Sequence, residues 1–108
     1  MTGIDKTKRA RLESAGWRVA GAAEFLGLTP EEAAFIELKL ALASYLRELR
    51  RSRGWIQAEV AVLLGSSQSR VAKMEAADST VSVDLLVRSL LRLGATREEV
   101  ARAIAPAA

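Results

Sequence analysis

Polar and cationic side chains suited to recognising a ligand gather in one short stretch near the middle of the chain. They are Gln68, Ser69, Arg70 and Lys73, and the next acid is Glu75. A glutamine amide can pair with one edge of adenine, an arginine guanidinium can donate twice to guanine, and serine or lysine can reach a phosphate. An ordinary solvated helix face is the alternative, but such a face normally includes acids. The set therefore predicts contact with nucleic acid.

Two short helices joined by a tight turn are predicted to carry these side chains. In residues 56–75, IQAEVAVLLGSSQSRVAKME, Ala61 is small where the helices come closest, and Gly65 stands where the chain must leave the first helix through a left-handed conformation. We expect helices over about 57–64 and 67–75. The apolar residues that close over each other are Val60, Leu64, Val71 and Met74.

This segment resembles the helix-turn-helix of the Xre-type, lambda-repressor-like family of DNA-binding domains. The resemblance extends from about Leu46 to about Leu93 and includes the glycine turn and the closing glutamate. One departure is Ile56, where the family usually has Thr or Ser, although Glu59 keeps the other half of a capping box. A lost cap costs about 1 kcal/mol, so the change tunes the first helix and does not remove the motif.

The resemblance implies that the second motif helix lies in the major groove with its N-terminal end against the bases. It also implies that Gln57 contacts a phosphate from the start of the preceding helix; the alternative is a simple polar residue at a helix start. Lys73 and Arg53 are the cations predicted to contact further phosphates. The complete predicted DNA-binding set is Gln57, Ser67, Gln68, Ser69, Arg70, Lys73 and Arg53.

Two further roles follow from the resemblance. Arg50 and Glu75 match positions that form a partly buried ion pair between the first helix of the fold and the end of the recognition helix, so their predicted role is structural. Residues 81–93 are more apolar than one buried stripe requires, and family members commonly dimerise through this region. The alternative is that all of these residues are internal core. The candidate interface residues are Val83, Leu86, Val87, Leu90 and Leu91.

Composition limits the classes of function. The chain has 108 residues, of which 50% are hydrophobic, enough for one helical core. It has no cysteine and no histidine, which excludes disulfides, Cys/His zinc sites and thiol or imidazole catalysis, and we expect no cofactor and no metal. No apolar run has the length of a membrane span and no secretory signal is recognisable. We expect a cytoplasmic protein without membrane contact.

The predicted fold is all-α: a lambda-repressor-like five-helix domain over residues 37–108 after an N-terminal helical extension over 1–36. Apolar residues recur at helical spacing, and strand alternation is absent. The extension is expected to hold helices over about 5–15 and 20–26, and it is either a degenerate second hairpin or a partner-binding segment. The domain is expected to begin on a long helix ending near Arg53 and to finish with helices over about 83–93 and 96–104.

These features predict a sequence-specific DNA-binding repressor that acts as a homodimer on a palindrome in double-stranded operator DNA. The small size and the helical extension resemble type II antitoxins of the HigA kind, which neutralise a small basic toxin and repress their own operon. The residues proposed to dock such a toxin are Glu24, Glu31, Glu32 and Glu37.

Other functions remain open. The alternatives are a stand-alone phage-type or stress regulator without a toxin, and an interaction module that has lost DNA binding. An enzyme is not expected, because no carboxylates are placed with a nucleophile, a metal set or a phosphate-cradling glycine loop.

Overall fold

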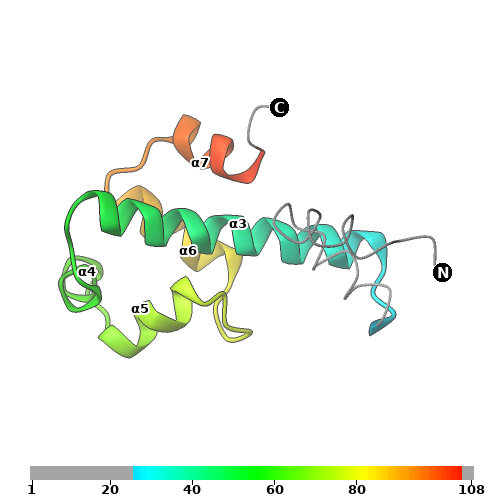
Figure 1. The fold of residues 1–108 in the computed structure, drawn as a ribbon, viewed down its shortest axis with the longest axis horizontal. Helices are drawn as coiled ribbons and strands as arrows, with labels where there is room; N and C mark the ends of the chain where they lie inside the picture. Colours follow the sequence, from blue (N-terminus) through cyan, green and yellow to red (C-terminus); the bar gives the residue numbers. More distant parts are fainter. Residues whose placement is uncertain (1–25, 106–108) are drawn as a thin grey trace, which may run out of the picture. The chain divides into compact units, whose positions relative to one another are not determined.

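The computed structural model describes residues 26–105, and within that range it contains five α-helices and no strand (Figure 1). The all-α prediction is confirmed. The expected helix over 5–15 lies outside the described residues, as does that over 20–26 apart from Leu26. The helices are α3 (Pro30–Ser52), α4 (Gln57–Leu64), α5 (Gln68–Glu75), α6 (Val83–Arg92) and α7 (Arg97–Ile104).

The chain divides into two compact units, Met1–Glu37 and Leu38–Ala108. The described part of the first unit includes the start of α3, where Thr29 is the N-cap. The Glu32 amide donates to the Thr29 hydroxyl at 3.1 Å, and the Thr29 amide donates to the Glu32 carboxylate at 2.7 Å. This reciprocal capping box is why the helix begins where it does. The predicted division at residues 36/37 remains a prediction.

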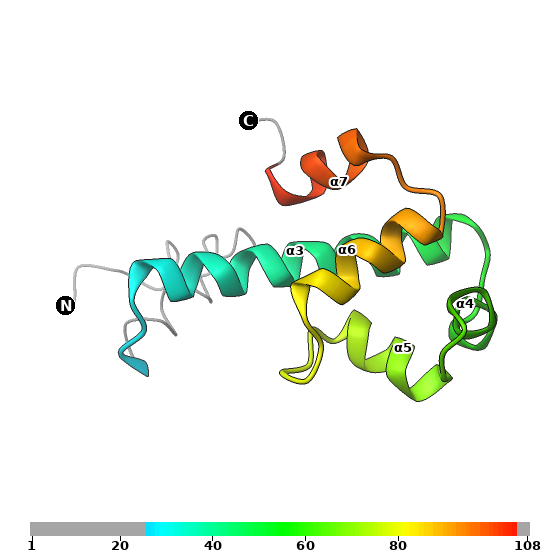
Figure 2. The same cartoon turned by 180° about the vertical axis from the view of Figure 1, so that it is seen from behind.

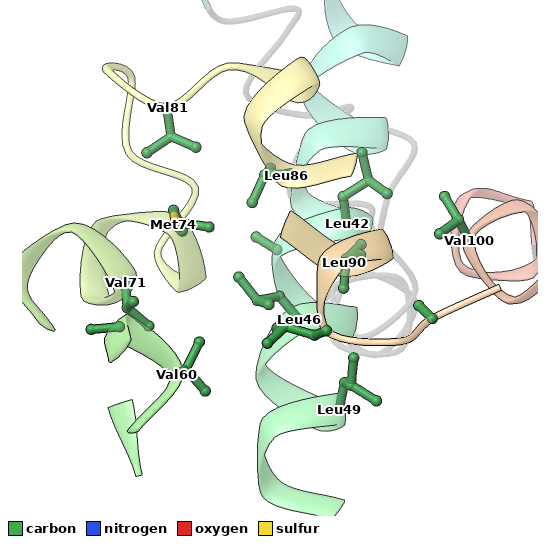
Figure 3. Close-up of a cluster of buried hydrophobic side chains, with 14 residues drawn as sticks. Leu42, Leu46, Leu49, Val60, Val71, Met74, Val81, Leu86, Leu90 and Val100 are labelled. Carbon is green, nitrogen blue, oxygen red and sulfur yellow. The ribbon is translucent and has the colours of Figure 1, made fainter. Parts of the chain in front are cut away.

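The second unit is built around a core between α3 and α6 (Figure 2). Leu42, Leu46 and Leu49 recur at helical spacing along α3, and the first two are 0% exposed. Figure 3 shows side chains of α4, α5 and α6 directed toward this stripe. In both ribbon views α5 and α7 lie on opposite sides of the α3–α6 pair. The core residues from the other helices are Val60, Val71, Met74, Leu86, Leu90 and Val100.

The turn between α4 and α5 has the geometry that its sequence predicts. Gly65 has φ 64° and ψ 40°, the left-handed conformation, and Ala61 is only 5% exposed. The amide of Ser66 donates to the Ala61 carbonyl at 2.8 Å, and that of Gly65 donates to the Val62 carbonyl at 3.1 Å. These bonds satisfy carbonyls in the last turn of α4. The turn therefore sets the direction in which α5 crosses the core.

Both motif helices begin as their sequence indicates. Ser67 is the N-cap of α5, and its hydroxyl accepts from the Arg70 amide at 3.1 Å. Ile56 provides no side-chain cap for α4, but its own amide donates to the Glu59 carboxylate at 2.8 Å. Half of the capping box is thus present.

The predicted dimer interface needs a correction. Leu86 and Leu90 are 0% exposed because they pack inside the subunit against α3, so neither has surface left for a second copy. Val83 and Val87 are half-buried, whereas Leu91 is 42% exposed. Only these last three residues remain as interface candidates.

Replacing Gly65 with alanine should lower the free energy of unfolding by about 1 kcal/mol. No atom lies within 4 Å of a Cβ added at this position, so the cost comes from the left-handed backbone alone. Gly65→Asn is the matched control, because asparagine tolerates this conformation better than alanine. Chemical denaturation followed by circular dichroism measures both variants. Equal stability of the alanine variant and the parent would contradict the backbone explanation.

Candidate nucleic-acid interface

A bidentate ion pair between Arg50 and Glu75 joins α3 to the end of α5. Arg50 Nε donates to Glu75 Oε2 at 2.5 Å, and Arg50 Nη2 donates to Glu75 Oε1 at 3.1 Å. The side chains are only 14% and 6% exposed. Hydrogen bonding to Glu75 raises the pKa of Arg50 above its ordinary value, against the opposing effect of burial. Nη1 of Arg50 also donates to the Trp55 carbonyl at 3.0 Å. The pair therefore ties α5, α3 and the α3–α4 connection together.

From this ion pair, a chain of hydrogen bonds leads to the first residue of α5. Gln57 Nε2 donates to Glu75 Oε1 at 3.2 Å, and Gln68 Nε2 donates to Gln57 Oε1 at 3.1 Å. Gln57 is half-buried at the start of α4, whereas Gln68 is exposed. An exposed side chain is thus held by contacts that end at the largely buried Arg50–Glu75 pair.

The bonds that hold these two amides leave hydrogen-bonding capacity free. Each amide nitrogen has two hydrogens, and within residues 26–105 each donates one of them to a protein acceptor. Gln68 also keeps its carbonyl oxygen, so it offers one donor and one acceptor, the pattern complementary to adenine N7 and N6 in the major groove. Gln57 keeps a donor suited to a phosphate.

The remaining side chains of α5 are arranged by its packing. Val71 and Met74 are buried, so the opposite side of the helix is exposed and carries Ser69 and Lys73. Glu75, the helix's one acid, is turned inward to Arg50. The exposed face of α5 is consequently free of negative charge.

Arg70 lies on the flank of α5 nearer α6. It lines a hollow of about 240 Å³ together with Arg88 and Arg92 of α6. Arg70 belongs to the site predicted from the sequence, whereas the two arginines of α6 do not. Their spacing of four residues places them on one side of a helix, a signal that could have identified them.

Arg53, predicted to bind a phosphate, makes contacts within the protein. Its Nη1 donates to the Leu93 carbonyl at 3.4 Å, and its guanidinium carbon lies 5.4 Å from the centroid of the Trp55 ring. At that distance the cation interacts with the ring face. The structure thus places Arg53 against the α6–α7 connection, apart from the hydrogen-bond chain, and its phosphate role stays a prediction.

The loop after α5 is tied back to α3. Lys39 Nζ donates to the Asp78 carbonyl at 2.9 Å, and the Asp78 carboxylate accepts from the amide and hydroxyl of Thr80 at 2.9 and 2.7 Å. These Thr80 hydrogen bonds hold the pKa of Asp78 below its ordinary value. The loop therefore has its own ordered conformation beside the site.

Other kinds of site find little support in this part of the chain. Among the described side chains, no group of three or more His, Cys, Asp or Glu residues is placed to hold a metal ion. None of the helices in the described range is both long and apolar enough to cross a membrane. A larger hollow, about 590 Å³, lies between α3 and α7 and is lined by Tyr45, Glu48, Glu99 and Arg102 among others. Its charges are mixed, and it is separate from α5.

A family model described as a helix-turn-helix domain matches residues 41–103, more than half of the 108 residues. That range includes α4, α5 and α6 and the core-forming part of α3. No curated protein and no solved structure matches the chain significantly.

Removing one partner of the Arg50–Glu75 pair should cost about 3 kcal/mol of stability, because the other charge would stay largely buried without a counter-ion. Arg50→Met and Glu75→Leu should each show this loss in urea denaturation, and the double variant should lose clearly less than the sum. Additive losses would show that the two groups act independently.

The exposed pair between Asp84 and Arg88 provides a control for that cycle. Its atoms are 3.6 Å apart and its side chains are 75% and 77% exposed, so Asp84→Ala should change stability by about 0.5 kcal/mol or less.

Proposed function

Because the chain belongs to the helix-turn-helix domain family, we propose that this DNA-binding protein is a sequence-specific transcriptional repressor. The observation that carries the proposal is the acid-free exposed face of α5, whose first side chain, Gln68, is held through Gln57 by the largely buried Arg50–Glu75 pair. A preorganised side chain loses little freedom on binding, which favours discrimination between bases.

The geometry supports a docking arrangement with α5 in the major groove. Gln68 and Ser69 are then the first side chains to reach base edges. Gln57 contacts a phosphate of the DNA backbone with its free amide hydrogen. It stands at the N-terminal end of α4, where the helix dipole favours a phosphate. Lys73 contributes a charge that acts on every sequence alike.

We also propose that the repressor acts as a homodimer on two half-sites about one helical turn apart. A twofold interface places the same apolar surface on both copies. The accessible candidates are Leu91, which is 42% exposed, and the half-buried Val83 and Val87.

The partner proposed from the resemblance is a small basic toxin, which would make the protein an autoregulating antitoxin that acts by binding and not by catalysis. Support comes from the first turns of α3, where Glu31, Glu32 and Glu37 are all exposed; Glu24 lies outside the described residues. The alternative is a regulator without a toxin. Co-purification with the product of an adjacent gene for a small basic protein would support the antitoxin. Failure to co-purify would favour the regulator without a toxin.

Gln68→Ala should weaken binding to the preferred duplex and relax the preference at one base pair by about 1–3 kcal/mol. An operator selected from random oligonucleotides provides the substrate, and fluorescence anisotropy on the operator and its single-base variants provides the measurement. Lys73→Ala is the control, since it should weaken operator and random DNA equally and flatten the salt dependence. An unchanged base preference in Gln68→Ala would remove this residue from the base-reading set.

Leu91→Glu should shift the monomer–dimer equilibrium toward monomer, because it places a charge in the proposed twofold interface. Analytical ultracentrifugation over a concentration series measures the shift. Val62→Glu is a matched control on α4, where the side chain is 80% exposed. A dimer weakened by Val62→Glu and not by Leu91→Glu would move the interface to α4.

A further inference from the structure

The hollow between α5 and α6 forms a basic groove, which we name the arginine groove. Its volume is about 240 Å³. Apolar residues line part of it, and three arginines from two helices line the rest together with Ser66 and Ser89. Arg88 and Arg92, the two arginines from α6, lie four residues apart and so share one side of that helix. The apolar residues are Leu64, Met74 and Leu85, and the cations are Arg70, Arg88 and Arg92.

The arginine groove carries a net positive charge. No carboxylate is among its lining residues. Arg88 has one acidic neighbour, Asp84 at 3.6 Å, but both side chains are more than 70% exposed, so water screens the pair strongly. Within residues 26–105, the side chain of Arg70 makes no hydrogen bond. Three cations that line one hollow favour an anion between them.

One of the three arginines is hydrogen-bonded to the end of α4. Arg92 Nε donates to the Leu63 carbonyl at 3.1 Å. That carbonyl belongs to the last turn of α4, where carbonyl groups have no partner within the helix. Among the described residues, the two Nη groups of Arg92 make no hydrogen bond and remain available as a donor fork.

We propose that the arginine groove binds a backbone phosphate of the DNA duplex beside the bases that α5 reads. This inference rests on the proposed function and extends it from α5 to α6. Arg70 stands in the first turn of α5, two residues after Gln68 and therefore on a different side of the helix, so the groove flanks the base-reading end of α5. Guanidinium groups match phosphate geometry with paired hydrogen bonds. Arg70 is thereby assigned to the DNA backbone in place of the guanine contact predicted from sequence.

The test compares two double variants of the full chain that remove the same charge. Arg88→Gln/Arg92→Gln neutralises the arginine groove, and Arg97→Gln/Arg102→Gln neutralises two exposed cations of α7, outside it. Affinity for the selected operator and for a random duplex is measured by anisotropy over a series of salt concentrations. Circular dichroism and thermal unfolding verify that both variants are folded.

The groove variant should lose the same factor of affinity on operator and random DNA, with base preference unchanged. Its plot of log affinity against log salt should become shallower by about 0.9 for each phosphate that the protein no longer neutralises. The α7 variant should change the slope much less.

Equal slopes in the two double variants, with DNA binding by the parent intact, would overturn the groove and leave the proposed function standing. Absence of DNA binding by the parent would overturn both. A groove variant that keeps parental DNA affinity but no longer binds poly-L-glutamate would assign the groove to an acidic protein partner, which also overturns the phosphate assignment.

Discussion

The Arg50–Glu75 ion pair is the interaction on which the arrangement of the site depends. Two largely buried charges are costly to remove from water, and the cost is offset here by two hydrogen bonds between them and by further bonds to Trp55 and Gln57. Because these partners lie on different segments, the pair sets the position of α5 relative to α3 and to the start of α4. The hydrogen-bond chain to Gln68 begins from it.

The pair also decides the charge of the surface that α5 presents. Val71 and Met74 fill the core, which leaves the opposite side of the helix to solvent. Glu75 could have projected an acid near that surface, but Arg50 holds it inward. The result is a short helix whose exposed side chains are neutral or cationic, as a surface that approaches phosphates requires.

Helix α6 contributes side chains to both the core and the arginine groove. Leu86 and Leu90 close the core against α3, while Arg88 and Arg92, on a different side of the same helix, line the arginine groove. The bond from Arg92 to the Leu63 carbonyl joins α6 to the end of α4. Packing and charge on α6 are therefore connected: the leucines place the helix, and its placement brings its arginines beside Arg70.

The local structure was determined by the sequence itself. The capping boxes at Thr29 and Thr96, the serine caps at Ser67 and Ser82, and the left-handed turn at Gly65 all depend on neighbouring residues, so the helix bounds agree with the prediction to within about one residue at most ends.

What the tertiary structure decided is which faces meet. Periodicity marks an apolar stripe but not its partner, so Leu86 and Leu90 were predicted at an interface and lie in the core. The sequence predicts a phosphate contact for Arg53, which stays a prediction, but it does not predict the contacts of Arg53 with Leu93 and Trp55 that the structure shows. The arginine groove joins residues of two helices that approach only when α3 and α6 pack. The spacing of residues within one segment cannot predict these contacts, because they form between residues distant along the chain.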